Sequence, residues 1–157
     1  MFTNTDLLLN TLNGANDKMA EERQAIALFE KAQRSAAQKR MFAFLTGRCT
    51  CLLSLSQVLG LRSPANRHYL GLQQIAINQI HGSAARTSDF DASFNPLSAR
   101  TMQRWTGVLL ARLNDTPLPP VDLIKVGEEY FVRDGHHRIS VAHALGQEFI
   151  EAEVTEW

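Results

Sequence analysis

The segment Tyr130 to Val154 constrains the fold most, because it changes periodicity twice within a short distance. The run EEYFVRD is typical of a strand, HHRISVAHAL of a helix that stops at Gly146, and EFIEAEVTE of a final strand. A further strand-like run, VDLIKV, precedes them across a tight turn near Gly127. This order of elements predicts a small mixed sheet with flanking helices.

The front half of the chain instead has the period of helices. Over residues 21–45 apolar side chains recur every three or four residues with basic side chains between them, which predicts one amphipathic helix. Asn16 or Asp17 is expected to cap this helix, residues 1–15 to form a frayed or loosely docked start, and Gly47 to break or bend the helix. The apolar positions are Ile26, Phe29, Ala32 or Ala36, Phe42 and Leu45.

Between these two parts, the segment LLSLSQVLGL predicts a second helical segment that ends near Gly60, and Pro64 marks a linker. The run LQQIAINQIHG then suggests a short strand, and residues 98–113 a helix that NDTPLPP stops. The chain is therefore expected to be an α+β protein. Its predicted units are a helical N-terminal arm over residues 1–70 and a compact domain over residues 71–157.

The run RDGHHR lies where a predicted strand ends and a predicted helix begins. Such a junction leaves backbone N–H groups unpaired at the positive end of the helix dipole, where they can hold an anion. Gly135 lets the backbone approach a ligand closely. His136, His137 and Arg138 add side-chain donors, and a guanidinium suits phosphate oxygens. The sequence therefore predicts a phosphate-binding turn.

Asp134 has two interpretations. A carboxylate beside a phosphate repels it, unless the carboxylate helps to hold Mg²⁺ or acts as a base toward a substrate hydroxyl. Alternatively, Asp134 only caps the helix, and the spacing leaves both interpretations open. A histidine-bound transition metal is disfavoured, because adjacent histidines on a helix diverge and His136 and His143 lie two turns apart.

The stretch FVRDGHHRISVAHALG resembles the signature of the ParB/sulfiredoxin superfamily. The pattern covers residues 71–157, and the whole chain is similar to small bacterial proteins labelled ParB-like. The resemblance implies a strand, a Gly-x-x-Arg turn and a helix that bind nucleotide phosphates. It also implies a phosphate-binding arginine in the loop after the first strand, where Arg86 stands. A solvated surface side chain is the other interpretation of Arg86.

The turn residues separate three branches of that superfamily. Sulfiredoxins have Gly-Cys-His-Arg, so His136 at the cysteine position removes the nucleophile for sulfinic acid repair. ParB partition proteins have Gly-Glu-Arg-Arg followed by a DNA-binding unit, and because the chain stops after the last strand, centromere partitioning is not expected. The free-serine kinase branch has Asp-Gly-His-x-Arg, and this pattern is matched by Asp134, Gly135, His136 and Arg138. The catalytic acid of that branch lies in the segment after the first strand, where this chain has Asp89 and Asp91.

The expected function is nucleotide binding, with a nucleoside triphosphate or diphosphate and Mg²⁺ as cofactor and activity as a nucleotide hydrolase or phosphotransferase. The candidate catalytic residues are Asp134 and His136, and the candidate phosphate ligands are Arg86, Gly135, His136, His137 and Arg138. No set of protein metal ligands is predicted. The chain has no apolar run long enough to span a membrane and no basic secretory start, so a cytoplasmic location is expected.

A non-enzymatic, DNA-associated or regulatory role is the alternative, in which the front helices bind a partner. The segment LSLSQVLGLRSPANRHYLGL has helix-turn-helix proportions, and residues 1–70 carry nine basic and five acidic side chains. The seven basic and eleven acidic side chains of the remainder disfavour a broad surface for the nucleic acid backbone. The long helix could also pair with a second copy to form a homodimer, or fold back on its own domain.

Cys49 and Cys51 are the cysteines of the chain. On a helix, residues two apart point to different faces, which disfavours a bridge between them. With no second pair nearby, a zinc or redox site is also disfavoured. We therefore expect two small, partly buried thiols.

Overall fold

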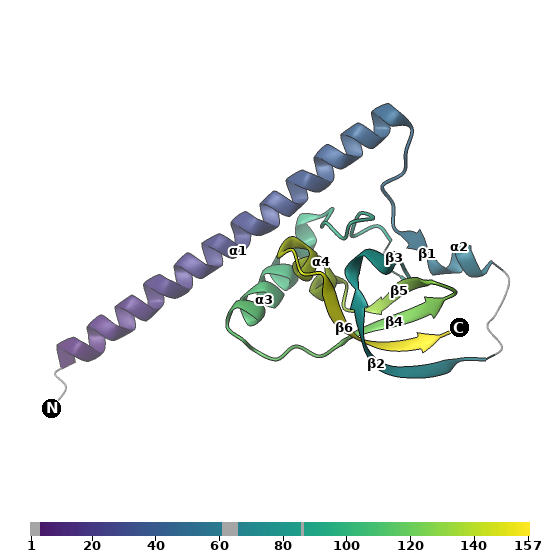
Figure 1. Cartoon of the computed structure of the whole chain (residues 1–157). Helices are drawn as coiled ribbons and strands as arrows, with labels where there is room; N and C mark the ends of the chain where they lie inside the picture. The colour runs from purple at the N-terminus through teal and green to yellow at the C-terminus, as the bar shows by residue number, and fades with distance from the viewer. Residues whose placement is uncertain (1–3, 61–65, 86) are drawn as a thin grey trace.

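The computed structural model describes residues 4–60, 66–85 and 87–157, with side chains from Asp17 onward. Six strands and four α-helices make up this part of the chain (Figure 1). The helices are α1 (Asn4–Thr46), α2 (Leu55–Leu59), α3 (Met102–Leu113) and α4 (His136–Ala144). The strands are β1 (Leu53–Ser54), β2 (His68–Ala76), β3 (Ile80–Ser83), β4 (Val121–Val126), β5 (Glu129–Asp134) and β6 (Phe149–Glu156). The α+β class is confirmed.

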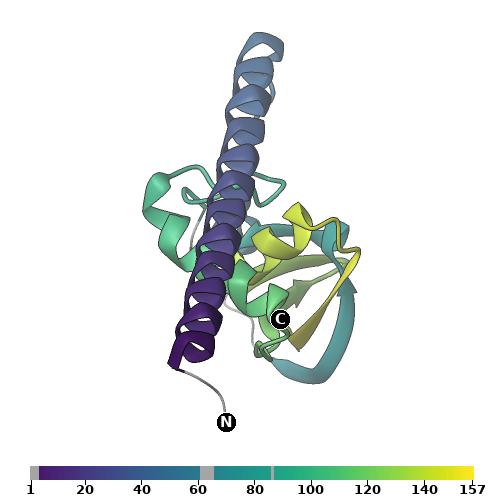
Figure 2. The same ribbon diagram turned by 90° about the vertical axis from the view of Figure 1, so that its left-hand side faces the viewer.

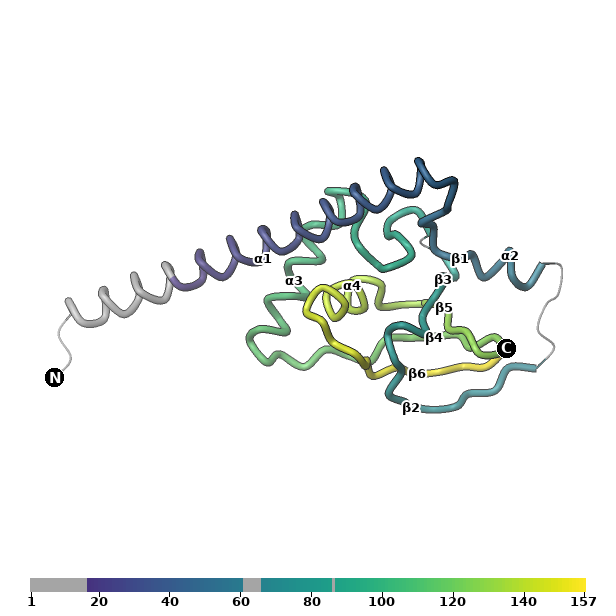
Figure 3. The backbone as a smooth tube through the Cα atoms, turned by 45° about the horizontal axis from the view of Figure 1, so that its top comes forward, coloured from purple at the N-terminus to yellow at the C-terminus, as the bar shows by residue number. Residues whose placement is uncertain are grey.

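The strands form one mixed sheet in the order β1-β3-β5-β4-β6-β2, which can be followed across Figure 3. β1 runs parallel to β3, β3 parallel to β5, and β4 parallel to β6. The β4–β5 hairpin and the β2–β6 pair are antiparallel. The predicted hairpin, the helix after it and the last strand are therefore confirmed, and β6 lies inside the sheet between β4 and β2.

Both faces of the sheet bury apolar side chains. On one face, Phe90 and Phe94 from the loop before α3 join Ile139 of α4 over Val132 and the neighbouring strand residues. On the other face, α2 places Leu55 against Ile124 and Phe131. Residues on opposite faces alternate along the strands, as the buried positions of β6 show.

The helices form successive layers away from the sheet, with α4 on the sheet, α3 on α4, and α1 across α3 (Figures 1 and 2). The Trp105 indole N–H donates to Ser140 Oγ at 2.8 Å, which ties α3 to α4. Phe29 of α1 meets the Trp105 ring edge to face at 5.5 Å between ring centroids. This second apolar cluster holds the long helix on the body of the protein.

The predicted apolar stripe of α1 is partly wrong. Phe42 and Leu45 are 67% and 75% exposed and Ile26 is 40% exposed, whereas Phe29 is buried as predicted. The buried side of the helix is formed by Ala25, Phe29, Ala32, Ala36 and Ala43. Alanine side chains allow a helix to lie close to its neighbour, so small residues rather than the largest ones face inward.

The limits of α1 also differ from expectation at one end. The helix begins at Asn4, so Asn16 and Asp17 do not cap it and the backbone of residues 4–15 is helical rather than frayed. No proline interrupts this segment, and its leucines are strong helix formers. The other end is confirmed, since α1 stops at Thr46 and Gly47 follows with a φ of 65°.

The helix-turn-helix interpretation of residues 53–72 is wrong. α2 has five residues, and the segment from His68 onward is strand β2 rather than a second helix. β2 pairs with β6 along its length, because the sheet supplies hydrogen bonds that a short isolated helix lacks. The sheet also takes β1 from before the predicted boundary at residue 70, by pairing it with β3.

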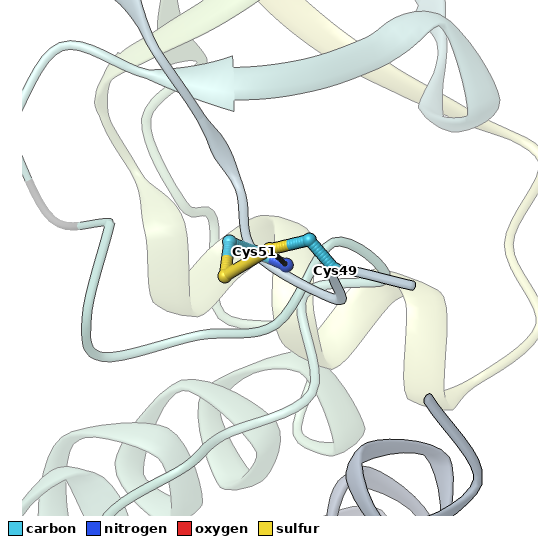
Figure 4. The surroundings of a disulfide bond; sticks show 2 residues. All are labelled: Cys49 and Cys51. Atoms are coloured by element: carbon cyan, nitrogen blue, oxygen red, sulfur yellow. Dashed lines mark hydrogen bonds between the residues drawn. A yellow bond between two sulfur atoms is a disulfide. The ribbon is translucent and has the colours of Figure 1, made fainter. Parts of the chain in front are cut away.

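The expectation for the cysteines is wrong as well. Cys49 and Cys51 lie in the connector after α1, not on a helix, and a disulfide joins them with Cα atoms 5.4 Å apart (Figure 4). Outside a helix, residues two apart can turn their side chains to the same side, which the helical assumption excluded.

Among the described residues, no helix has the length and apolar character needed to cross a bilayer.

Candidate functional site

The candidate site lies where β5 passes into α4, as the sequence predicted. Gly135 begins the helix with a φ of 102°, a left-handed conformation that favours glycine. A Cβ at this position would lie 2.6 Å from Cγ1 of Val121. Both the turn and the tight packing beneath it therefore require glycine.

The N-cap residue of α4 is Gly135, so the N-cap position itself supplies no side-chain cap. Gly135 makes no side-chain cap hydrogen bond, and no acidic residue lies in the first turn. The first helical bond runs from Ile139 N–H to the Gly135 carbonyl at 3.0 Å. Asp134 accordingly does not cap the helix, which removes one of its two interpretations.

Asp134 instead pairs with Arg138. Nη2 of Arg138 donates to Oδ2 of Asp134 at 2.7 Å, and the Asp134 side chain is 78% exposed. Nη1 of Arg138 donates to the carbonyl oxygens of Pro119 and Pro120, the latter at 2.8 Å. The guanidinium is thus fixed at the turn and joins it to the segment before β4.

A hollow of about 250 Å³ opens beside this turn. It is lined by Pro119, Arg104, Asp134, Gly135, His137 and Arg138, among others. Arg104 reaches it from α3, where it is exposed and lies one turn before Val108, which lines the same hollow. Two arginines, a histidine and the amino end of a helix therefore line one small space.

The His136 side chain has a different environment from the one predicted. It is 4% exposed, and Nε2 lies 2.7 Å from Oγ of Ser83, a fully buried residue at the end of β3. Its ring stacks on Phe90 at 5.9 Å, while the partly buried His137 ring meets Phe90 edge-on at 5.3 Å. The imidazole of His136 joins β3 to α4 in the interior, so a side-chain bond to phosphate stays a prediction.

The loop between β3 and α3 is organised by Asp91. Its buried carboxylate accepts hydrogen bonds from the Ser93 and Asn95 backbone N–H groups at 2.9 Å each and from the Asn95 side-chain amide. These bonds give Asp91 a structural role in shaping the loop.

Arg86 lies outside the described residues, so its predicted phosphate contact stays a prediction.

His143 lies away from the turn, in a second hollow lined also by His81 and Glu148. Burial lowers the pKa of His143 below its ordinary value; the positive charge of Lys39 lowers it further, whereas Asp91 opposes the shift. Within the described ranges, no three His, Cys, Asp or Glu side chains lie together as metal ligands would.

Sequence reasoning missed three residues of this region: Arg104, Ser83 and Phe90. Arg104 precedes the buried Trp105 on α3 and lies four residues before Val108, so helical spacing could have placed it toward α4. Ser83 and Phe90 meet His136 across more than forty residues of sequence, and nothing in the local pattern indicates those contacts.

Comparisons with known proteins add a weak likeness. No protein-family model and no curated protein matches the chain. Among solved structures, it is similar to the crystal structure of sulfiredoxin from Arabidopsis thaliana, at 18% identity and a TM-score of 0.40. The match covers 53% of this chain and 82% of that one. An identity and a TM-score this low assign no function to this chain.

Proposed function

We propose that this chain binds the phosphate groups of a nucleotide in the hollow at the amino end of α4. The observation that carries the proposal is that Arg104, Arg138 and the amino end of α4 line one space of about 250 Å³. A helix amino end favours negative charge, and two guanidinium groups add charge-assisted donors. That volume suits phosphate groups, with the rest of a nucleotide extending toward solvent.

Each residue of the turn has its own part in this proposal. Gly135 brings the backbone close to the ligand, and His137 lines the hollow. Arg104, which is exposed, supplies a guanidinium that can reorient toward an anion. Arg138 has three protein acceptors and positions the turn, so its direct contribution to phosphate binding is smaller than the sequence suggested.

Asp134 fits a role with Mg²⁺. The ion is usually held by one or two carboxylates together with substrate phosphates. The exposed Asp134 carboxylate lies at the hollow, and Asp122 is its register partner on β4. Mg²⁺ would there neutralise phosphate charge, and Asp134 would hold it or accept a proton from a substrate hydroxyl. Activity as a hydrolase or phosphotransferase rests on this role.

Calorimetric titration with ATP, ADP and CTP, each with and without Mg²⁺, tests the proposal. We expect binding that Arg104→Ala weakens about ten- to a hundredfold, the range for a lost hydrogen bond between charged groups. Arg34→Ala is the matched control, because Arg34 is an exposed arginine on α1 paired with Glu30. It should leave the affinity unchanged.

The proposal fails if neither a nucleotide nor inorganic tripolyphosphate binds, or if Arg104→Ala binds as tightly as the wild type. Arg138→Ala is a poor test, because it also removes bonds to Pro119 and Pro120. Arg138→Lys, with circular dichroism to verify folding, is the more useful variant.

Turnover is tested separately by Mg²⁺-dependent release of phosphate from ATP. Asp134→Asn should abolish release while binding without Mg²⁺ persists, because the amide no longer attracts the cation or accepts a proton. If the wild type binds nucleotide and releases no phosphate with any hydroxyl acceptor, the chain is a nucleotide-binding protein and not an enzyme of this kind.

A further inference from the structure

The connector between α1 and β1 contains a disulfide at an exposed position. Cys49 and Cys51 are both exposed, and only Thr50 separates them (Figure 4). In the loop-entropy account, a disulfide stabilises a fold more as it closes a longer loop, so a bridge across three residues contributes little. A role in holding the fold together therefore explains this pair poorly, and a chemical role explains it better.

The backbone around the pair is fixed. The Thr50 carbonyl accepts a hydrogen bond from Ala92 N–H at 2.8 Å, and Cys51 forms an antiparallel bridge with Asp91. Asp91 is itself held by Ser93 and Asn95. The two sulfur atoms are therefore presented on an ordered loop rather than on a loose one.

The two cysteines are not equivalent. The backbone N–H of Cys51 donates to Sγ of Cys49 at 3.2 Å, and Arg48 precedes Cys49. A hydrogen-bond donor and a neighbouring guanidinium both stabilise negative charge on sulfur. Cys49 is therefore the better thiolate, and Cys51 is placed to resolve a mixed disulfide.

Apolar and basic side chains surround the pair. A hollow of about 530 Å³ beside the cysteines is lined by Arg40, Met41, Phe44 and Arg48, and another of about 440 Å³ by Phe42. At the end of α1, Phe44 is 87% exposed and Met41 is 66% exposed. A polypeptide with apolar side chains next to its own cysteines would cover this surface.

We propose that Cys49 and Cys51 form a thiol–disulfide exchange site for cysteine pairs within apolar segments of another polypeptide. In the reduced form, Cys49 thiolate attacks one sulfur of the substrate disulfide, forms a mixed disulfide and releases the other sulfur as a thiolate. Cys51 thiolate then attacks Cys49 Sγ and releases the second substrate thiolate. Two electrons pass to the substrate, and the Cys49–Cys51 bond forms. Two equivalents of a low-molecular-weight thiol then reduce the Cys49–Cys51 bond in two exchange steps, leave as their own disulfide and restore the reduced chain.

Trapping the intermediate tests the order of attack. The full chain carrying Cys51→Ser is mixed with oxidised glutathione and followed by mass spectrometry, with Cys49→Ser as the matched control. We expect Cys51→Ser to gain one glutathione about threefold faster, because a thiol pKa lower by about one unit gives about ten times more thiolate near neutral pH, of which lower nucleophilicity cancels about a factor of three. Reduced wild type should form the internal disulfide and retain no glutathione. Equal rates for the two variants, or wild type that retains glutathione, would overturn the assignment.

The pH dependence of alkylation tests whether Cys49 is the better thiolate because its pKa is lowered. In the Cys51→Ser chain, the rate of reaction with iodoacetamide should reach half its maximum well below about pH 8.5, the ordinary value for a free cysteine. Adding Arg48→Gln should raise that midpoint, whereas Arg34→Gln on the exposed side of α1 should not. An unshifted midpoint at about 8.5 contradicts an activated Cys49.

The apolar surface is tested with two disulfide probes, oxidised glutathione and a synthetic peptide whose cysteines lie among leucines. Phe44→Ser should slow exchange with the peptide severalfold and leave exchange with glutathione unchanged. Leu113→Ser, at a position 52% exposed on α3, is the control and should change neither rate. Equal rates of the Phe44→Ser and wild-type chains with the peptide would show that this surface does not select the substrate.

Discussion

At the scale of single residues, Gly135 determines whether β5 can pass directly into α4. Its positive φ and its closeness to Val121 both exclude a side chain, and the amino end of α4 depends on the turn it makes. Two buried polar residues likewise fix the local structure around them. Ser83 ties β3 to His136, and Asp91 holds the loop before α3 in shape.

Gly135→Ala should lower the free energy of unfolding by about 2 kcal/mol or more, because the new Cβ would clash with Val121 at a strained φ. Urea denaturation followed by tryptophan fluorescence measures this. The control is Gly107→Ala within α3, where nothing lies within 4 Å of the new Cβ. It should stabilise the protein by roughly 0.5–1 kcal/mol, and equal effects at the two positions would contradict the account.

His143 predicts a dependence of stability on pH. Its folded-state pKa is lowered by burial and by Lys39, against an opposing effect of Asp91. Above about pH 6.5 both states are neutral and the residue contributes no dependence. Below that pH the unfolded chain takes up the proton first, so stability falls as pH falls toward the folded-state pKa. In urea unfolding at several pH values, the wild type should lose more stability than His143→Gln below about pH 6.5. Parallel curves would contradict this.

At the scale of elements, α1 is held on the body of the protein by packing against α3. A 43-residue helix crosses the body and buries a narrow stripe of small side chains with one aromatic ring. The ring of Phe29 against Trp105 is the largest contact of that stripe. Trp105 also bonds to Ser140 of α4, so the packing of α1 is linked to the helix that forms the candidate site.

Phe29→Ala should therefore lower the free energy of unfolding by about 3–5 kcal/mol, the range for truncating a buried phenylalanine. Thermal unfolding followed by circular dichroism measures the change. Phe44→Ala on the same helix is the control, because Phe44 is 87% exposed, and it should stay within about 0.5 kcal/mol of the wild type. A small effect at Phe29 would mean that α1 does not depend on α3.

At the scale of the whole molecule, charge is balanced. The chain has sixteen basic and sixteen acidic residues and an isoelectric point of about 7.0. A protein without net charge lacks the mutual repulsion that keeps molecules apart in solution. Homodimer formation through α1 stays a prediction, and the exposed apolar end of α1 is the surface that would take part in it. A cytoplasmic location also stays a prediction.

Solubility against polyethylene glycol should accordingly be lowest near pH 7 and rise on either side. Lys18→Glu, at an exposed position of α1, should raise solubility at pH 7 by giving the chain a net negative charge. Lys18→Arg keeps the positive charge and should leave the solubility at pH 7 unchanged. If the two variants behave alike, net charge does not govern the association.

Local patterns made β4, β5, α4 and β6 predictable, because each carries its own periodicity and Gly127, Gly135 and Gly146 mark their ends. The turn at Asp134 and Gly135 was predictable for the same reason. The Ser83–His136 bond was not, since it joins residues 53 apart in sequence. The α1 stripe was mispredicted because large apolar residues were expected inside, and the cysteines because they were assigned to a helix, whereas they lie in the connector after α1.

The position of β6 has a consequence for synthesis. β6 follows the other described strands in sequence, yet it lies between β4 and β2, and among the described strands β2 pairs with β6 alone. Until β6 has been made, β2 and β4 would both carry an open edge with unpaired N–H and C=O groups. The sheet can close only after β6 emerges, so a nascent chain that still lacks β6 is the form most in need of a chaperone.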